Sequence, residues 1–191
     1  MMTDNDPQYT YRQSILTKPW TFGLKNNALT WEEEGKPLRM IPFTQITKVQ
    51  PKFDPTRVQL NRHILHVHTT QNGIIKIASM TYQGINDFKD QASSYRTFIK
   101  AFHEQLSAAN PKMQFSKGIT QLGYLASIGV LIFLIVLLVG AVGFILMGAV
   151  NFIILIKLGL LLYFIPSLVG YIRKNKPGTY DPLNLPADIL P

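Results

Sequence analysis

The sequence predicts a mixed α+β domain followed by a two-helix transmembrane hairpin. Short runs of β-branched and aromatic residues, separated by turn dipeptides, fill residues 9–83. One amphipathic helical pattern follows at about residues 85–108, and an almost uninterrupted apolar block comes after it. The 191 residues are therefore divided into a domain at 1–110, a basic linker at 111–117, the hairpin at 118–172 and a proline-rich tail at 173–191.

Turn residues set the order of the predicted strands. Asn26-Asn27 and Asn72-Gly73 are typical of tight β-hairpin turns and are each flanked by β-prone runs. The run Leu38–Val49 reads as a longer strand that Pro42 interrupts, because proline is confined to sheet edges and bends. The segment Pro51–Pro55 is expected to be a loop.

The helical pattern is defined by apolar residues three or four positions apart: Phe88, Ala92, Tyr95, Ile99, Phe102 and Leu106, with Phe98 beside them. Polar residues occupy the other positions, so one face of this helix is expected to cover a sheet. Asn110-Pro111 is expected to end it.

The segment Ile41–Val49, IPFTQITKV, resembles the third strand of bacterial pleckstrin-homology-like (PH-like) domains. With the order of strands followed by one helix, the resemblance covers about residues 9–108. It implies a curved β-sheet capped by a C-terminal helix, in a small membrane-anchored protein. The first hairpin offers Lys18 and Lys25 without the arginines of lipid-binding PH domains, so specific phosphoinositide binding is not expected.

The apolar block predicts two membrane crossings. No charged residue occurs from Gly118 to Ile156, and a single crossing takes only about 20 helical residues. Basic residues flank both predicted crossings, whereas the connection within residues 142–151 is uncharged. These membrane-surface cations are Lys112, Lys117, Arg173, Lys174 and Lys176. The positive-inside rule then places both termini in the cytoplasm, at a bacterial inner membrane with anionic headgroups.

Lys157 is the one ionisable residue within the apolar block. An intramembrane charge is costly and is often functional. A lysine near the end of a crossing can instead extend its ammonium group to the headgroup region. Both interpretations of Lys157 remain open at the level of the sequence.

The sequence contains little that indicates catalysis. Cysteine is absent, and no nucleophile elbow, phosphate-binding loop or zinc-protease motif occurs. His63, His66 and His68 are the only clustered candidate metal ligands, and His66 and His68 would share one face of a strand. A polar outer strand face is the favoured reading of this pair. We therefore predict no catalytic residue, no metal and no cofactor.

The predicted function is that of a membrane-anchored adaptor or accessory protein. Its expected partners are an anionic bilayer and another protein, because basic residues beside a membrane anchor indicate lipid headgroups in preference to nucleic acid. The expected contact surfaces are a sheet edge, a basic face and the tail. Two alternatives remain: a small subunit of a transport or channel complex, and a membrane enzyme acting on lipid or envelope intermediates.

Overall fold

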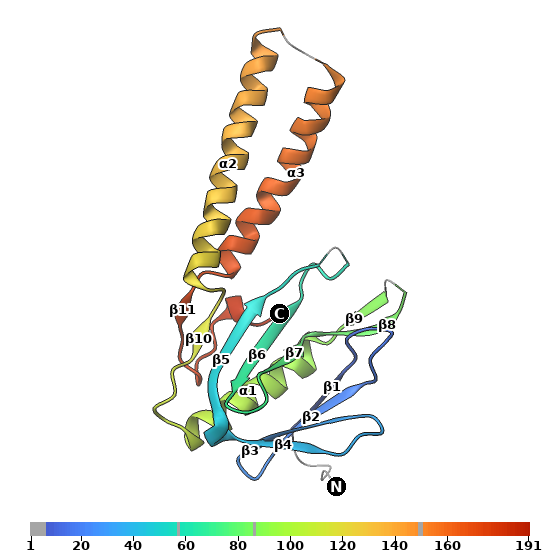
Figure 1. The fold of residues 1–191 in the computed structure, drawn as a ribbon, viewed down its shortest axis with the longest axis vertical. Coiled ribbons are helices and arrows are strands. Elements are labelled where there is room, and N and C mark those ends of the chain that lie inside the picture. The colour runs from blue at the N-terminus through green and yellow to red at the C-terminus, as the bar shows by residue number, and fades with distance from the viewer. Residues whose placement is uncertain (1–6, 57, 86, 149–150) are drawn as a thin grey trace. The chain divides into compact units, whose positions relative to one another are not determined.

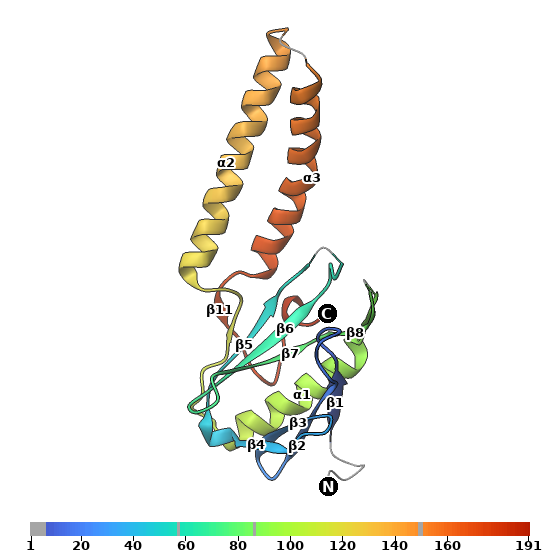
Figure 2. The ribbon, with the colours of Figure 1, turned by 45° about the vertical axis from the view of Figure 1, so that its right-hand side comes forward.

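The computed structural model describes residues 7–56, 58–85, 87–148 and 151–191. The chain divides into two compact units. The α+β unit contains residues 1–118 together with residues 178–191, and the hairpin unit contains residues 119–177. Figures 1 and 2 show several strands and one helix in the first unit and two long helices in the second.

The first sheet is antiparallel and has the strand order β1-β2-β3-β4. Its strands are β1 (Gln8–Tyr11), β2 (Trp20–Lys25), β3 (Ala28–Glu33) and β4 (Arg39–Pro42). Asn26 and Asn27 join β2 to β3 with φ values of 52° and 54°. Asparagine adopts this left-handed conformation more readily than most residues, and tight hairpin turns require it. The predicted asparagine turn is therefore confirmed.

The second sheet has the order β5-β6-β7 and is also antiparallel. A 3-10 turn, η1 (Phe43–Gln45), follows the break predicted at Pro42 and leads into β5 (Ile46–Phe53), β6 (His63–Thr69) and β7 (Ile74–Ala78). The predicted loop at Pro51–Pro55 is wrong in its first part, because Pro51 lies within β5 opposite Leu65. The carbonyl of Pro51 accepts a hydrogen bond from the N–H of Gly118 at 3.0 Å. Proline fits here because β5 is the last strand of this sheet.

The helix begins later than the sequence predicts. Helix α1 spans Ala92–Ala109, whereas β9 (Asp87–Asp90) pairs with β8 (Met80–Gly84). Phe88 therefore lies in a strand opposite Tyr82, with the ring centroids 5.4 Å apart. The carboxylate of Asp90 accepts a hydrogen bond from the N–H of Ala92 at 2.9 Å, which satisfies one donor of the first helical turn. The four-residue spacing of Phe88 from Ala92 does not mark a helical turn.

The apolar stripe of α1 is buried in the core, as predicted. Its buried side chains are Tyr95, Phe98, Ile99, Phe102, His103 and Leu106. The ring of Phe102 meets that of Phe43 edge-on at 5.9 Å, and Phe98 stacks on Tyr9 at the same distance. Figure 2 shows α1 lying across the strands that it covers. This aromatic packing joins the helix to both the first sheet and η1.

The C-terminal segment completes the α+β unit. Strand β10 (Ser116–Lys117) pairs antiparallel with β11 (Gly178–Thr179), and the 3-10 turn η2 (Ala187–Ile189) follows. Ile189 is only 3% exposed, and Leu185 and Leu190 pack against the core. Lys117 and Asp188 form an ion pair at 2.5 Å. The sequence predicts a separate tail at residues 173–191, whereas in the structure residues 178–191 pack with residues 1–118.

The hairpin unit consists of α2 (Gln121–Leu146) and α3 (Phe152–Lys174). The side chains of Thr120 and Asn151 cap the two helices, accepting hydrogen bonds from the N–H groups of Gly123 and Ile154. Helix α3 continues through Pro166, although proline removes one bond of the helical ladder. Residues 149 and 150, within the predicted connection, lie outside the described residues.

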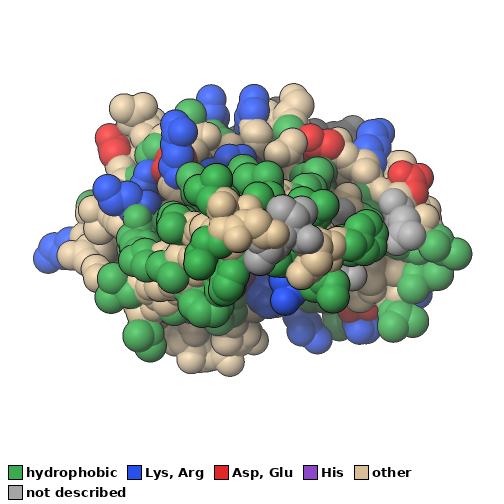
Figure 3. Space-filling model, turned by 90° about the horizontal axis from the view of Figure 1, so that it is seen from above, with side chains coloured by type: hydrophobic (Ala, Val, Ile, Leu, Met, Phe, Trp, Pro, Cys, Tyr) green, Lys and Arg blue, Asp and Glu red, His purple; other side chains and the backbone are tan. Residues whose placement is uncertain are grey.

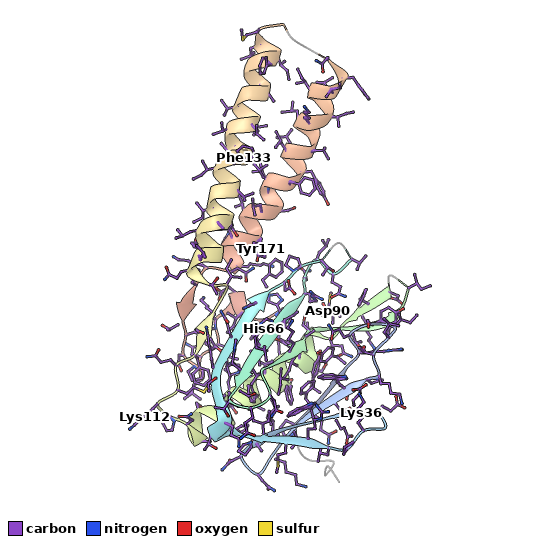
Figure 4. The ribbon with its side chains drawn as sticks, viewed as in Figure 1. Lys36, His66, Asp90, Lys112, Phe133 and Tyr171 are labelled. Atoms are coloured by element: carbon purple, nitrogen blue, oxygen red, sulfur yellow. The ribbon has the colours of Figure 1, made fainter. Side chains whose placement is uncertain are left out.

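Both hairpin helices are long and apolar enough to cross a membrane, with mean hydropathies of 3.1 and 2.4. Hydrophobic side chains project around both of them, with Phe133 about midway along α2 (Figure 4). Figure 3 looks down on the connecting end of the hairpin and shows hydrophobic side chains gathered there. The predicted pair of apolar helices is confirmed.

Candidate functional site

The first candidate site is a pocket of about 230 Å³ between the inner face of the first sheet and β7, the aromatic pocket. Its lining residues are Tyr11, Gln13, Trp20, Trp31, Arg39, Asn72, Ile74, Ile75 and Lys76. The antiparallel register places Tyr11 opposite Trp20 and Trp31 opposite Arg39. Side chains opposite one another project from the same face of a sheet, so these four converge although they are distant in sequence.

Two tyrosine hydroxyls fix one wall of the aromatic pocket. Tyr11 donates to the carbonyl of Lys76, and Tyr9 donates to the carbonyl of Ala78, both at 2.6 Å. Burial raises the pKa of Tyr11 well above its usual value, so its hydroxyl remains a neutral donor at ordinary pH. These bonds join β1 to β7 across the two sheets and hold the aromatic pocket in a fixed shape.

The chemistry of the aromatic pocket suits a ligand that is partly apolar and partly anionic. Trp20 and Trp31 supply indole surface and Arg39 supplies a cation at the same opening, whereas Lys76 contributes the backbone carbonyl that accepts from Tyr11. Indole rings bind apolar and proline-containing groups, and guanidinium binds carboxylates with two parallel hydrogen bonds. Sequence reasoning missed this site, although Trp20 and Trp31 are the only two tryptophans of the chain.

The second candidate surface is the outer face of the second sheet, the basic face. It carries Lys48, Lys52, His66, His68 and Lys76. Lys48 pairs with His68 and His66 pairs with Lys76, whereas the alternate residues Leu65 and Val67 are buried in the core. The predicted alternation of β6 is thus confirmed, and Figure 4 shows His66 on this sheet. The rings of His66 and His68 lie 6.4 Å apart.

The electrostatics of the basic face disfavour a metal cation. Burial, together with the nearby charges of Lys52 and Lys76, lowers the pKa of His66 to about 4. Burial and Lys48 also lower the pKa of His68. A metal ion at these imidazoles would approach several ammonium groups. Within the described ranges, no group of three potential metal-binding side chains occurs. The basic face has the chemistry of an anion-binding surface.

A buried histidine joins α1 to the C-terminal segment. The Nδ1 atom of His103 lies 2.7 Å from the carbonyl of Ile99, and its Nε2 atom lies 2.7 Å from the hydroxyl of Tyr180. Because a carbonyl only accepts, Nδ1 donates to Ile99, and in a neutral imidazole Nε2 then accepts from the hydroxyl of Tyr180. Burial lowers the pKa of His103 to about 4, although the hydrogen bond to Ile99 acts in the opposite direction.

The state of His103 predicts a fall in stability on mild acidification. An unfolded histidine has a pKa of about 6.5, so between pH 6.5 and pH 4 the unfolded chain binds a proton that the folded unit does not. The contribution of His103 to the free energy of unfolding is complete above pH 6.5. It is lost at about 1.4 kcal/mol per pH unit as the pH falls towards 4. We expect the measured free energy of unfolding to decrease over this window.

This prediction can be measured by urea denaturation of a hairpin-free variant. In that variant Asn-Gly joins Gly118 to Gly178, because Lys117 and Gly178 are already paired and a three-residue loop closes such a ribbon. The same titration of the H103Q variant is the control, since glutamine does not titrate. Equal pH slopes in the two proteins would contradict the assignment to His103.

The five cations predicted for the membrane surface lie at the two ends of the hairpin sequence. Lys112 is exposed after α1, and Arg173 and Lys174 occupy the last turn of α3. Lys176 is exposed beyond that helix. Lys117 differs from them because it is half-buried and paired with Asp188. Its charge is therefore compensated within the α+β unit.

Comparisons with known proteins add little to these observations. No protein-family model matches the chain, and no curated protein matches it. Among solved structures, it is similar to a chain in the structure of the Spt16D Pob3N heterodimer, with 14% identity and a TM-score of 0.34. The match, a weak PH-like neighbour, covers 61% of this chain and 54% of that one. The chain thus spans about half the length of this neighbour, and no functional statement rests on a likeness at that level.

Proposed function

We propose that this chain is a non-enzymatic, membrane-anchored adaptor that presents a PH-like binding domain at the cytoplasmic face of a membrane. Two apolar helices with mean hydropathies of 3.1 and 2.4 support the anchor. The aromatic pocket and the basic face support binding, because they combine ligand-accessible aromatic groups with an excess of cations. Residues 1–117 contain 15 Lys and Arg against 9 Asp and Glu.

One observation carries the topology in this proposal. The α+β unit is assembled from residues on both sides of the hairpin, through the pairing of Ser116 with Thr179 and the ion pair of Lys117 with Asp188. A packed domain cannot be divided by a lipid bilayer, since its polar backbone and core must remain together. This assembly supports a hairpin that crosses the membrane twice, and the basic residues at both of its ends favour the cytoplasm for the domain.

Cysteine labelling tests this topology directly, because the natural sequence has no cysteine. Met147 and Leu183 are both highly exposed, and they lie at the connecting end of the hairpin and in the C-terminal segment. We expect a membrane-impermeant maleimide to label the M147C variant in intact cells and to label L183C only after the cells are opened. Labelling of L183C in intact cells would overturn the topology.

The proposed partner segment is an extended peptide. Residues 115–118 cover the free side of β5 through the Phe115–Val49 bridge and the hydrogen bond to Pro51. On β7, the carbonyls of Ala78 and Lys76 already accept hydrogen bonds from the hydroxyls of Tyr9 and Tyr11. Strand β4 is an edge strand of the first sheet, and Arg39 of this strand also lines the aromatic pocket. A peptide added beside β4 would gain backbone hydrogen bonds and reach the aromatic pocket with a side chain.

The basic face predicts weak and salt-sensitive binding to anionic vesicles. Its lysines are spread over two strands, β5 and β7, so we expect the hairpin-free variant to bind vesicles of several anionic lipids with similar affinity. Binding should weaken as salt is raised from about 0.1 M to 1 M, because the Debye length falls from about 10 Å to about 3 Å. A sedimentation assay with neutral vesicles as the control measures this. Preference for one headgroup would indicate a formed lipid site instead.

An accessory role in a larger membrane complex is the second candidate function. A groove between the two hairpin helices, which contains Lys157, favours it. This role is compatible with an adaptor, since the hairpin would bind the complex and the α+β unit would recruit a further partner.

A further inference from the structure

The two hairpin helices are separated on one side by an apolar groove of about 780 Å³, the hairpin groove. Its wall on α2 is formed by Val130, Leu134, Leu137 and Ala141, and its wall on α3 by Lys157, Leu160, Leu161, Phe164, Ser167 and Leu168. All of these residues belong to the hairpin unit. The lining is apolar apart from Lys157 and Ser167.

The packing between α2 and α3 has a regular period. Among the half-buried residues, one series on α2 runs through Ser127, Leu131, Leu134, Leu138, Ala141 and Ile145, and one on α3 runs through Ile154, Leu158, Leu161, Ile165 and Leu168. Both series advance by alternating steps of three and four residues, which is the spacing of knobs-into-holes packing. The two helices therefore pack together along one seam.

The lining of the hairpin groove follows the same period and shares Leu134, Ala141, Leu161 and Leu168 with the seam. Its α2 wall advances from Val130 by steps of four, three and four residues. On its α3 wall Lys157, Leu161, Phe164 and Leu168 are also spaced by four, three and four residues, with Leu160 and Ser167 beside them. Val130, Leu137, Leu160 and Phe164 remain about half exposed there. Two parallel rows with helical spacing form the holes into which a third helix inserts its side chains.

Lys157 specifies the chemistry of that third helix. It is exposed, and it forms no ion pair among the described residues. An ammonium group on an apolar membrane helix is stabilised by a carboxylate in an adjacent helix. A second copy of the chain does not supply one, because residues 118–172 contain no Asp or Glu. Two copies meeting at this groove would bring like charges together.

We propose that the hairpin groove binds a transmembrane helix of a different protein, and that an Asp or Glu within that helix pairs with Lys157. This inference rests on the proposed membrane insertion of the hairpin. It assigns Lys157 a recognition role and makes the groove the surface through which the adaptor joins its complex.

Site-directed photocrosslinking of the full chain in its native membranes tests the proposal. Benzoylphenylalanine is placed at Leu160, which lines the hairpin groove, and as a matched control at Leu162, which is exposed on α3 but does not line the groove. We expect a protein adduct from position 160 and little from position 162. The adduct should map to an apolar span with an Asp or Glu within about two helical turns of the crosslink.

Substitution of Lys157 provides the decisive readout. We expect K157M to reduce the adduct about tenfold and K157R to retain it, because one interhelical polar contact in a membrane contributes an effect of that size. Methionine suits an apolar helix, so K157M does not impair insertion. Neutralising the carboxylate of the partner should reduce the adduct equally, and exchanging the two charges between the chains should restore it.

Several results would overturn the inference. These are an adduct only with lipid, an adduct with a second copy of this chain, a partner span without an acidic residue, and an adduct that K157M leaves unchanged. Failure of the underlying membrane insertion is recognised separately by the cysteine labelling of M147C. If M147C is labelled from outside while no adduct depends on Lys157, only the assignment of the groove fails.

Discussion

Removal of residues 178–191 will lower the free energy of unfolding of the α+β unit by about 3 kcal/mol or more. The estimate combines the loss of the buried Ile189 side chain, typically about 2–5 kcal/mol for truncation, with about 1 kcal/mol for the hydrogen bond between Tyr180 and His103. The loss also uncovers Phe115, whose ring contacts both His103 and Tyr180. The C-terminal segment is therefore a structural part of the domain.

The measurement compares two chains that both lack the hairpin. The hairpin-free variant retains residues 178–191 behind its Asn-Gly turn, and the truncated chain ends at Gly118. Urea denaturation should show a lower midpoint for the truncated chain, together with a smaller slope because less surface is buried. Adding the I189A substitution to the hairpin-free variant separates the contribution of one side chain. Equal midpoints for the two chains would show that residues 178–191 contribute nothing to folding.

Replacement of Phe102 by alanine will cost about 3–5 kcal/mol, which is the usual range for a phenylalanine removed from a core. Phe102 is 0% exposed and packs from α1 against η1, where its ring meets that of Phe43 edge-on. The cavity would open at the junction of the helix with the chain segment that joins the two sheets.

The K100A variant is the control for Phe102. Lys100 lies in the same helix but is exposed, and alanine is a better helix former than lysine, so stability should change by less than about 0.5 kcal/mol. Thermal or urea unfolding of the hairpin-free variant with each substitution gives the comparison. An F102A protein as stable as K100A would contradict the packing of α1 described above.

The sequence predicts those elements whose signals are local. The Asn26-Asn27 turn, the break at Pro42 and the two apolar helices each depend on a few neighbouring residues, and all three are present. The start of α1 is wrong by several residues because Phe88 fits both a helical stripe and a strand pair. The pairing of β8 with β9 decides between them, and a contact between strands leaves no periodic signal in one segment.

The candidate sites were less accessible to sequence reasoning. The aromatic pocket brings together side chains from β1 to β4 and from β7, so it depends on cross-strand register and on the meeting of two sheets. The bond between His103 and Tyr180 joins residues 77 positions apart. In contrast, the outward direction of His66 and His68 follows from strand alternation alone and was predicted.

A domain that needs both ends of the chain also constrains biogenesis. The ribosome delivers residues 1–118 first and the segment that covers His103 last, so the domain completes its fold only after the hairpin has been synthesised. In a chain anchored as proposed, a hairpin that crossed the bilayer only once would leave residues 178–191 on the opposite side of the membrane from residues 1–118. The domain would then remain unfinished and open to proteolysis. Under the proposed topology, completion of the domain would therefore depend on correct insertion of the hairpin.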